Sequence, residues 1–209
     1  MNAEELDSPL LRTRTKLNIH DVMRSGWLRP EDLPRDDVAA AEQLYADIHR
    51  DDQRLFEIRA AFIDDIERLT GATASDIGSF GLGLNLAASD LDLGVAWPRD
   101  RRHELRDLLE PAFTHLGDRQ TRFANVRTVF SAAREGIEVD LTVLCQQDYD
   151  MARGMHAAIA DQMLLAEKIA FTWVKSLLHE AGLKKEYNRW KSAPYHRFCP
   201  EFAPSPEGS

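Results

Sequence analysis

The sequence has little cysteine. Its 209 residues include two, Cys145 and Cys199, which lie far apart and have no nearby cysteine to pair with. Structural zinc sites usually take closely spaced pairs of cysteine or histidine ligands, and small disulfide-stabilised proteins need several cysteines. The cysteine pattern therefore argues against both classes. We interpret the two residues as reduced thiols and expect a cytoplasmic protein.

Excess positive charge and long apolar runs are also missing. The chain carries 26 Lys and Arg against 35 Asp and Glu, a net charge of −9. Proteins that grip long nucleic acids nonspecifically usually present a basic face, so this balance disfavours that class, whereas it suits a site that concentrates divalent cations. No stretch approaches the ~18 apolar residues of a membrane helix. The start, MNAEELDSPLLRTR, has no apolar signal core, so we expect neither a membrane span nor a secretory peptide.

The composition, with 44% hydrophobic and 29% charged residues, is typical of a globular domain. Three parts can be distinguished along the chain. Residues 1–35 show no sustained periodicity and are predicted to form a flexible arm with one short helix around Ile19 to Arg24. Residues 36–182 carry regular patterns and are predicted to form the domain. Residues 183–209 form a tail that is first basic and aromatic (KKEYNRWK) and then rich in proline.

The patterns within the domain predict both helices and strands. Apolar residues at helical spacing predict one helix over 36–69, or two with a break near Asp51, ended by Gly71. Further along, we expect short strands at 74–78 and 91–97, a helix capped by Asp100 and reaching Leu116, an antiparallel hairpin of 123–133 with 137–144, and a helix over 155–181 that ends at Gly182. The expected fold class is α/β (α+β): a small mixed sheet flanked by helices, with helical additions at both ends.

One stretch, residues 78–93 with the sequence GSFGLGLNLAASDLDL, combines a small-residue turn with two aspartates. Asp90 and Asp92 are two positions apart, so on a strand their side chains point the same way. A third carboxylate, Asp140, alternates with Val139 and Leu141 on a later strand. Carboxylates that converge repel one another unless a cation lies between them. Together the three predict an oxygen-rich Mg²⁺ site.

The turn that precedes the aspartates is suited to phosphate. Gly78 lets the backbone approach a ligand closely, and Ser79 offers a hydroxyl and an N–H group. If residues 81–86 began a helix, its N-terminus would add oriented amides. Each feature alone is weak, but their order along the chain is specific.

With these residues the segment resembles the signature of the DNA polymerase beta-like nucleotidyltransferases. The form of the motif that is most similar is that of the non-canonical poly(A) polymerases and terminal uridylyltransferases, G-S-x-x-x-G-L-x-L-x-x-S-D-x-D-L. The matching residues are Gly78, Ser79, Gly83, Leu84, Leu86, Ser89, Asp90, Asp92 and Leu93, followed by Val139-Asp140-Leu141 and by a helix with a lysine at 170–175. The resemblance covers about residues 55–182.

The resemblance implies a role for each of these positions. Asp90 and Asp92 would bind two Mg²⁺ ions, for which Mn²⁺ is a possible substitute, and Asp140 would bind the catalytic ion and help activate the attacking hydroxyl. Gly78 and Ser79 would hold the β- and γ-phosphates of a nucleoside triphosphate, ATP among the candidates. Lys175 and Lys168 would reach the triphosphate.

The implied reaction is transfer of a nucleoside monophosphate to an acceptor hydroxyl with release of pyrophosphate. The acceptor is either an RNA 3′ end or a small molecule. Two alternatives stay open: adenylylation of a partner protein, as in toxin–antitoxin pairs, and a catalytically silent nucleotide-binding module. The sequence departs from the family where Asn125-Val126-Arg127 replaces a strand with a proline. Base and acceptor choice therefore cannot be carried over.

Other aromatic and histidine residues have simpler interpretations. Trp173 lies on an apolar helical face and is expected in the core. Trp190, among cations, suits base stacking or a docked C-terminal tail about equally. The seven histidines show no ligand spacing and are expected to be surface residues or satisfied core residues.

Overall fold

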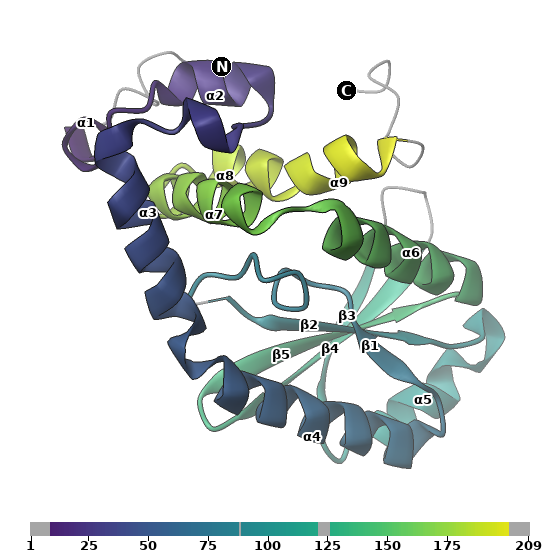
Figure 1. The fold of residues 1–209 in the computed structure, drawn as a ribbon. Helices are drawn as coiled ribbons and strands as arrows, with labels where there is room; N and C mark the ends of the chain where they lie inside the picture. The colour runs from purple at the N-terminus through teal and green to yellow at the C-terminus, as the bar shows by residue number, and fades with distance from the viewer. Residues whose placement is uncertain (1–8, 88, 121–125, 201–209) are drawn as a thin grey trace. The chain divides into compact units, whose positions relative to one another are not determined.

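The computed structural model describes residues 9–87, 89–120 and 126–200. The chain divides into two compact units, each built from separate stretches of sequence (Figure 1). Among the described residues, the first unit takes 9–50, 84–87 and 158–200, and the second takes 51–83, 89–120 and 126–157. The motif stretch 78–93 therefore contributes residues to both units.

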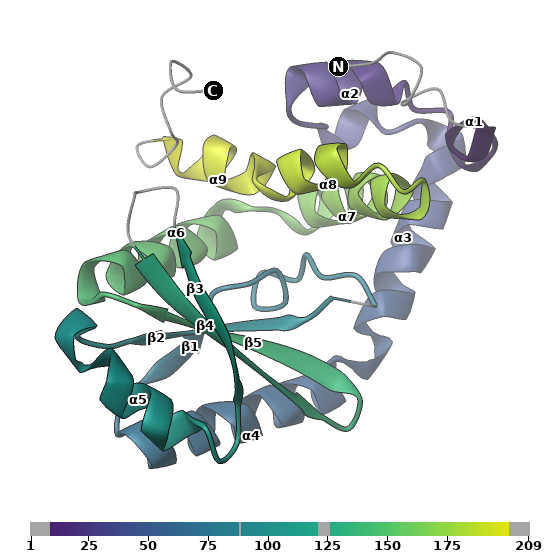
Figure 2. The ribbon, with the colours of Figure 1, turned by 180° about the vertical axis from the view of Figure 1, so that it is seen from behind.

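A five-stranded mixed sheet forms the centre of the second unit (Figure 2). Its strands are β1 (Ala74–Asp76), β2 (Leu91–Ala96), β3 (Thr114–Gln120), β4 (Val126–Arg134) and β5 (Ile137–Leu144). They lie in the order β1-β2-β5-β4-β3, and β2 and β5 are parallel while the other neighbouring pairs are antiparallel. The predicted class, a small mixed sheet with flanking helices, is confirmed.

Two helices of the second unit cover one face of this sheet. The helical elements of the second unit are α4 (Asp52–Thr70), η4 (Arg99–Arg101), α5 (Arg102–Leu109) and the first part of α6 (Gln146–Gln162). In α4 the stripe Ile58, Phe62 and Ile66 is buried against apolar residues of the strands. Because successive strand residues face opposite sides, Leu91, Leu93 and Val95 of β2 enter this core while Asp92 does not. Figure 1 shows α4 and α5 on the same side of the sheet.

All the secondary-structure elements described in the first unit are helices. It contains α1 (Pro9–Arg14), α2 (Ile19–Ser25), η2 (Pro30–Asp32), α3 (Arg35–Ile48), the end of α6, α7 (Leu165–Glu180), α8 (Lys184–Lys191) and α9 (Ala193–Phe198). Helix α7 is its centre, since most of its residues are buried. Trp27, Phe171 and Trp190 stack on one another, with ring centroids 5.4–6.3 Å apart. No helix within the described ranges is long and apolar enough to cross a membrane.

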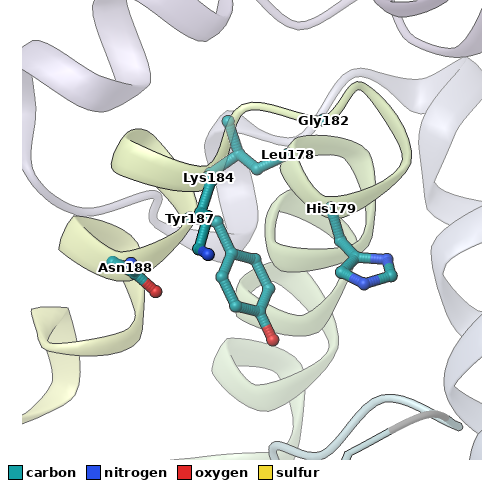
Figure 3. A pocket seen from close by; sticks show the side chains of 6 residues that line it. All are labelled: Leu178, His179, Gly182, Lys184, Tyr187 and Asn188. Carbon is teal, nitrogen blue, oxygen red and sulfur yellow. The ribbon is translucent and has the colours of Figure 1, made fainter.

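The first unit also contains a cavity of about 380 Å³ where α7 meets α8 (Figure 3). It is lined by Leu178, His179, Gly182, Lys184, Tyr187 and Asn188. The rings of His179 and Tyr187 lie 5.6 Å apart between centroids. None of these residues belongs to the motif stretch 78–93.

Several local predictions are confirmed. The stripe over 36–69 forms two helices, α3 and α4, separated by η3 (His49–Asp51), and Gly71 ends α4 with a φ of 70°. The hairpin of β4 and β5 turns through Glu135 and Gly136, whose φ angles of 53° and 80° suit a tight two-residue turn. Residues 123–125, which were expected at the start of this hairpin, lie outside the described residues. The helix expected at Ile19 is α2.

The helix predicted to reach Leu116 is shorter than expected. Helix α5 ends at Leu109, and residues 114–120 form strand β3, which the sequence did not indicate. Pro111 explains the end, because proline lacks the N–H group that continues a helix and restricts the residue before it. The apolar spacing of Phe113 and Leu116 was typical of a helix, but pairing with β4 places Leu116 in a strand. Asp100 does not cap α5; it lies inside η4.

The helix predicted over 155–181 is also corrected. It is two helices, because α6 begins at Gln146 and ends at Gln162, and α7 begins at Leu165. The Glu167 carboxylate accepts a hydrogen bond of 3.0 Å from the Leu164 backbone N–H, so a side chain of the first turn satisfies the start of α7. Gly182, with a φ of 70°, follows α7 as expected.

The described part of the tail 183–209 is packed into the first unit. Trp190 is 1% exposed and its indole N–H donates to the Phe171 carbonyl at 3.0 Å. A side chain held in this way does not stack on a base, so the docked-tail interpretation of Trp190 is the correct one. Trp173 is buried, as expected. The boundaries 1–35, 36–182 and 183–209 stay predictions.

Candidate functional site

Asp92 and Asp140 lie side by side on the two central strands of the second unit. They are register partners in the parallel pair β2–β5. Neighbouring strands are about 4.8 Å apart, and residues in register on parallel strands point to the same face. Both aspartates are half-buried, while Leu91 and Leu93 beside Asp92 are buried in the core on the opposite face. The sheet therefore holds two carboxylates together on one face.

Asp90 has a different position from the other two. It is exposed and precedes β2, which begins at Leu91, so strand alternation does not by itself direct its side chain. Among the described residues, no group of three or more His, Cys, Asp or Glu side chains is assembled closely enough to hold a metal ion. The structure thus brings Asp92 and Asp140 together, and the participation of Asp90 stays a prediction.

The glycine-serine turn lies against Asp92. The Ile77 backbone N–H donates to the Asp92 carbonyl at 2.9 Å, which carries the pairing of β1 and β2 up to the turn. Gly78 follows and is buried. A Cβ atom added to Gly78 would lie 2.5 Å from both Cβ and Oδ2 of Asp92, closer than any real side chain allows. Glycine is therefore required here by the close approach of the turn to the carboxylate.

Residues 79–83 continue the turn. Ser79 is half-buried, and the Gly83 N–H donates to the Phe80 carbonyl at 2.9 Å. Residues 81–86 form turns and irregular backbone, so the helix considered for this stretch is absent. Any phosphate held here would contact the amides of a turn, since no helix N-terminus is formed.

A charged cluster beneath the turn was missed in the sequence. Asp76, at the end of β1, has a side chain that is 10% exposed and accepts a hydrogen bond of 3.0 Å from the Gly78 N–H. Arg59 of α4 lies 3.5 Å from its carboxylate. His156 of α6 is buried nearby, and its imidazole is hydrogen-bonded to the Ile77 backbone. The signal available in the sequence was an aspartate two residues before a glycine turn, a spacing that favours hydrogen bonding to the turn.

Burial shifts the pKa of both titratable groups in this cluster. Desolvation raises the pKa of Asp76 above its ordinary value, although the backbone of Gly78 and the charges of His156 and Arg59 oppose the shift. Desolvation lowers the pKa of His156, with Asp76 and the Ile77 backbone acting in the opposite direction. Burial therefore favours the neutral form of each group, and the charge of the other group favours its charged form.

The two lysines expected at the triphosphate belong to the first unit. Lys175 is 1% exposed, and its ammonium group donates a hydrogen bond of 2.6 Å to the carbonyl of Leu84, in the middle of the motif. Lys168 is half-buried on the first turn of α7. The structure thus gives Lys175 a contact with the motif backbone, and the phosphate contacts of both lysines stay predictions.

The donors at this site suit a hard divalent cation. Asp92 and Asp140 offer only carboxylate oxygens, the ligands that Mg²⁺ prefers in proteins. Two adjacent like charges are stabilised by a cation between them. The close contact of Gly78 with Asp92 places the turn beside this carboxylate. A metal-bound triphosphate therefore fits the chemistry of this site.

Comparison with known proteins gives distant structural similarity alone. No protein-family model matches the chain. No curated protein matches it either. Similar solved structures include a cytoplasmic RNA terminal U-transferase (14% identity, TM-score 0.46), Cid1 with RNA terminal uridylyl transferase activity (14%, 0.48) and Cid1 poly(U) polymerase with MgGTP bound (14%, 0.48). Each match covers 70% of this chain but 46–47% of the other, so this chain spans less than half the length of those proteins.

Proposed function

We propose that the protein is a metal-dependent nucleotidyltransferase. It transfers a nucleoside monophosphate from a nucleoside triphosphate to an acceptor hydroxyl and releases pyrophosphate. The observation that carries this proposal is the register of Asp92 with Asp140, with Gly78 pressed against Asp92. A fold needs no such carboxylate pair for its stability, because adjacent like charges oppose folding.

Asp92 and Asp140, joined by Asp90, hold Mg²⁺ or Mn²⁺ in this proposal. When bound, the metal supplies positive charge that offsets the developing charge on the phosphates. Gly78 lets the turn approach the phosphates closely, and the N–H and hydroxyl groups of Ser79 hold the β- and γ-phosphates. These groups position the triphosphate, and positioning accounts for much of the catalysis of phosphoryl transfer.

The bond changes are those of an in-line displacement. The oxygen of the acceptor hydroxyl forms a bond to the α-phosphorus, and the bond from that phosphorus to the bridging oxygen of the β-phosphate breaks. Pyrophosphate leaves with the electron pair. Asp140 receives or directs the proton of the hydroxyl. Asp92 and Asp140 lie on one face of the β2–β5 pair, Gly78 and Ser79 lie in the adjoining turn, and Asp90 directly precedes β2.

The test is nucleotide incorporation by the Asp92→Asn and Asp140→Asn variants. Purified protein is incubated with Mg²⁺ and each labelled nucleotide, with RNA, candidate small molecules or cell lysate as acceptors. We expect both variants to lose transfer by at least about 100-fold. Glu138→Gln is the matched control, since Glu138 is an exposed carboxylate two residues from Asp140 on the same strand. Unchanged turnover in either aspartate variant would end the enzyme proposal.

The same assay decides among the alternatives. Label on RNA, on a small molecule or on a protein identifies the acceptor, and labelled protein is the outcome expected of a protein-adenylylating enzyme. Binding of a triphosphate without transfer to any acceptor favours the silent nucleotide-binding module.

A further inference from the structure

Asp76 lies next to the turn, and its side chain lies on the face of the sheet opposite the proposed metal site. Across the antiparallel pair β1–β2 it is the partner of Leu93, a core residue on the face opposite Asp92. Directly opposed residues on antiparallel strands share a face. Asp76 is therefore not placed to join Asp92 and Asp140 as a ligand, and its buried charge needs another explanation.

The contacts of Asp76 are directed to the turn. Its Oδ1 atom accepts the Gly78 N–H at 3.0 Å, and the Gly81 backbone also stabilises the carboxylate. A Cβ atom added to Gly81 would lie 2.8 Å from the Asp76 Cγ atom, so the chain passes directly over the carboxyl group. One carboxylate thus organises the backbone on both sides of Ser79.

Helix α4 completes this arrangement through Arg59. Its guanidinium lies 3.5 Å from Asp76 and 5.9 Å from the ring centre of Phe80. The cation therefore contacts the residue that precedes the turn and the residue that follows Ser79. Charge-assisted and cation–π contacts of this kind are strongest where water is excluded, and Phe80 is buried.

We propose that Asp76 is a positioning residue that holds the Gly78-Ser79 turn against Asp92 in the conformation that receives a triphosphate. Arg59 of α4 is ion-paired with its carboxylate, and the charge of His156 of α6 also stabilises the ionised form. The catalytic consequence rests on the proposed function, while the effect on the turn does not. Gly78 is then fixed on two sides, by Asp76 at its N–H and by Asp92 at its α-carbon.

The test compares Asp76→Ala, Asp76→Asn and Asp65→Ala in the full chain. Asp76→Ala removes the acceptor, whereas Asp76→Asn keeps an oxygen for the Gly78 N–H. Asp65 of α4 is the matched control, because it is another partly buried carboxylate of the second unit, ion-paired to Arg68 and Arg134. The first readout is hydrogen exchange at the Gly78 and Gly81 amides. We expect exchange at both to rise roughly tenfold or more in Asp76→Ala, and far less in the other two variants.

The second readout is the kinetics of nucleotide transfer. We expect Asp76→Ala to raise the KM for the triphosphate roughly tenfold or more, with a smaller change in kcat. Asp76→Asn, which keeps an acceptor for the Gly78 N–H, should have a KM close to that of the wild type. Equal exchange at Gly78 and Gly81 in wild type and Asp76→Ala, or an equal KM effect in Asp65→Ala, would overturn the positioning role. A wild-type protein that transfers no nucleotide refutes the proposed function instead, and the exchange experiment then still decides whether Asp76 holds the turn.

Discussion

Gly78 and Asp92 are in direct contact, with no room for a single additional carbon between them. A Cβ atom at position 78 would lie 2.5 Å from both Cβ and Oδ2 of Asp92. Asp92 in turn is in register with Asp140 on the neighbouring parallel strand. The geometry of the turn and the geometry of the carboxylate pair therefore depend on each other.

Gly78→Ala tests this dependence. The new methyl group must displace Asp92 or the turn, so we expect unfolding free energy to fall by about 1–3 kcal/mol and nucleotide transfer to fall by roughly 100-fold. Gly154→Ala is the control, since Gly154 lies in α6 of the same unit and an added Cβ there meets no atom within 4 Å. That change should raise stability by about 0.5–1 kcal/mol. Denaturant unfolding and transfer assays measure both, and an active, fully stable Gly78→Ala protein would contradict the close contact.

Metal dependence of stability tests the carboxylate pair. With a chelator present, Asp140→Asn removes one of two adjacent like charges and should raise stability by up to about 1 kcal/mol. Adding Mg²⁺ with a triphosphate should raise the melting temperature of the wild type and of Glu138→Gln, because ligands that bind the folded state stabilise it. Asp140→Asn should show little such shift. Thermal melts decide the matter; an equal shift in all three proteins would place metal binding elsewhere.

The charged cluster under the turn predicts a pH dependence of stability. The folded pKa of His156 lies below its ordinary 6.5, so the unfolded chain takes up a proton more readily as the pH falls below that value. This contribution to stability is complete above pH 6.5 and is lost as the pH falls through the folded pKa. Asp76 acts in the other direction, because its raised pKa gives stability that is complete below its ordinary 3.8 and is lost as the pH rises through the folded value.

We therefore expect the wild type to lose stability between pH 7 and pH 5 and His156→Gln, which cannot take up that proton, to lose less. The measurement is the melting temperature of both proteins across this range. Parallel curves would show that His156 does not contribute to the pH dependence.

Lys175 has two candidate roles, a structural hydrogen bond and a contact with the triphosphate. If its main task is the hydrogen bond to the Leu84 carbonyl, Lys175→Met leaves a buried acceptor without that donor and lowers unfolding free energy by about 1–3 kcal/mol. If it instead reaches the triphosphate, as the motif implies, the variant raises KM while stability changes little. Lys168→Met, a half-buried lysine of the same helix, serves as comparison and should change stability by less than about 0.5 kcal/mol. From the contact we expect the first outcome, which denaturant unfolding and steady-state kinetics together distinguish.

Local patterns in the sequence determined much of the second unit. The apolar stripe of α4, the glycine that ends it and the alternation of β5 are short-range properties, and the structure has them as predicted. The alternation alone placed Asp140 on the face opposite Val139 and Leu141, and the order of turn and aspartates led to the prediction of a metal site. Such features can be read from sequence because each depends on residues within one or two turns of helix or a few positions of strand.

Tertiary structure decided the features that depend on distant residues. The parallel pairing of β2 with β5 brings Asp92 and Asp140 into register, and the pairing of β3 with β4 makes a strand of residues with helical apolar spacing. The burial of Lys175 against Leu84, and the meeting of Arg59, Asp76 and His156, likewise join separate parts of the chain. No local pattern specifies which distant segments pack together, because that choice is made by burial and hydrogen bonding summed over the whole fold.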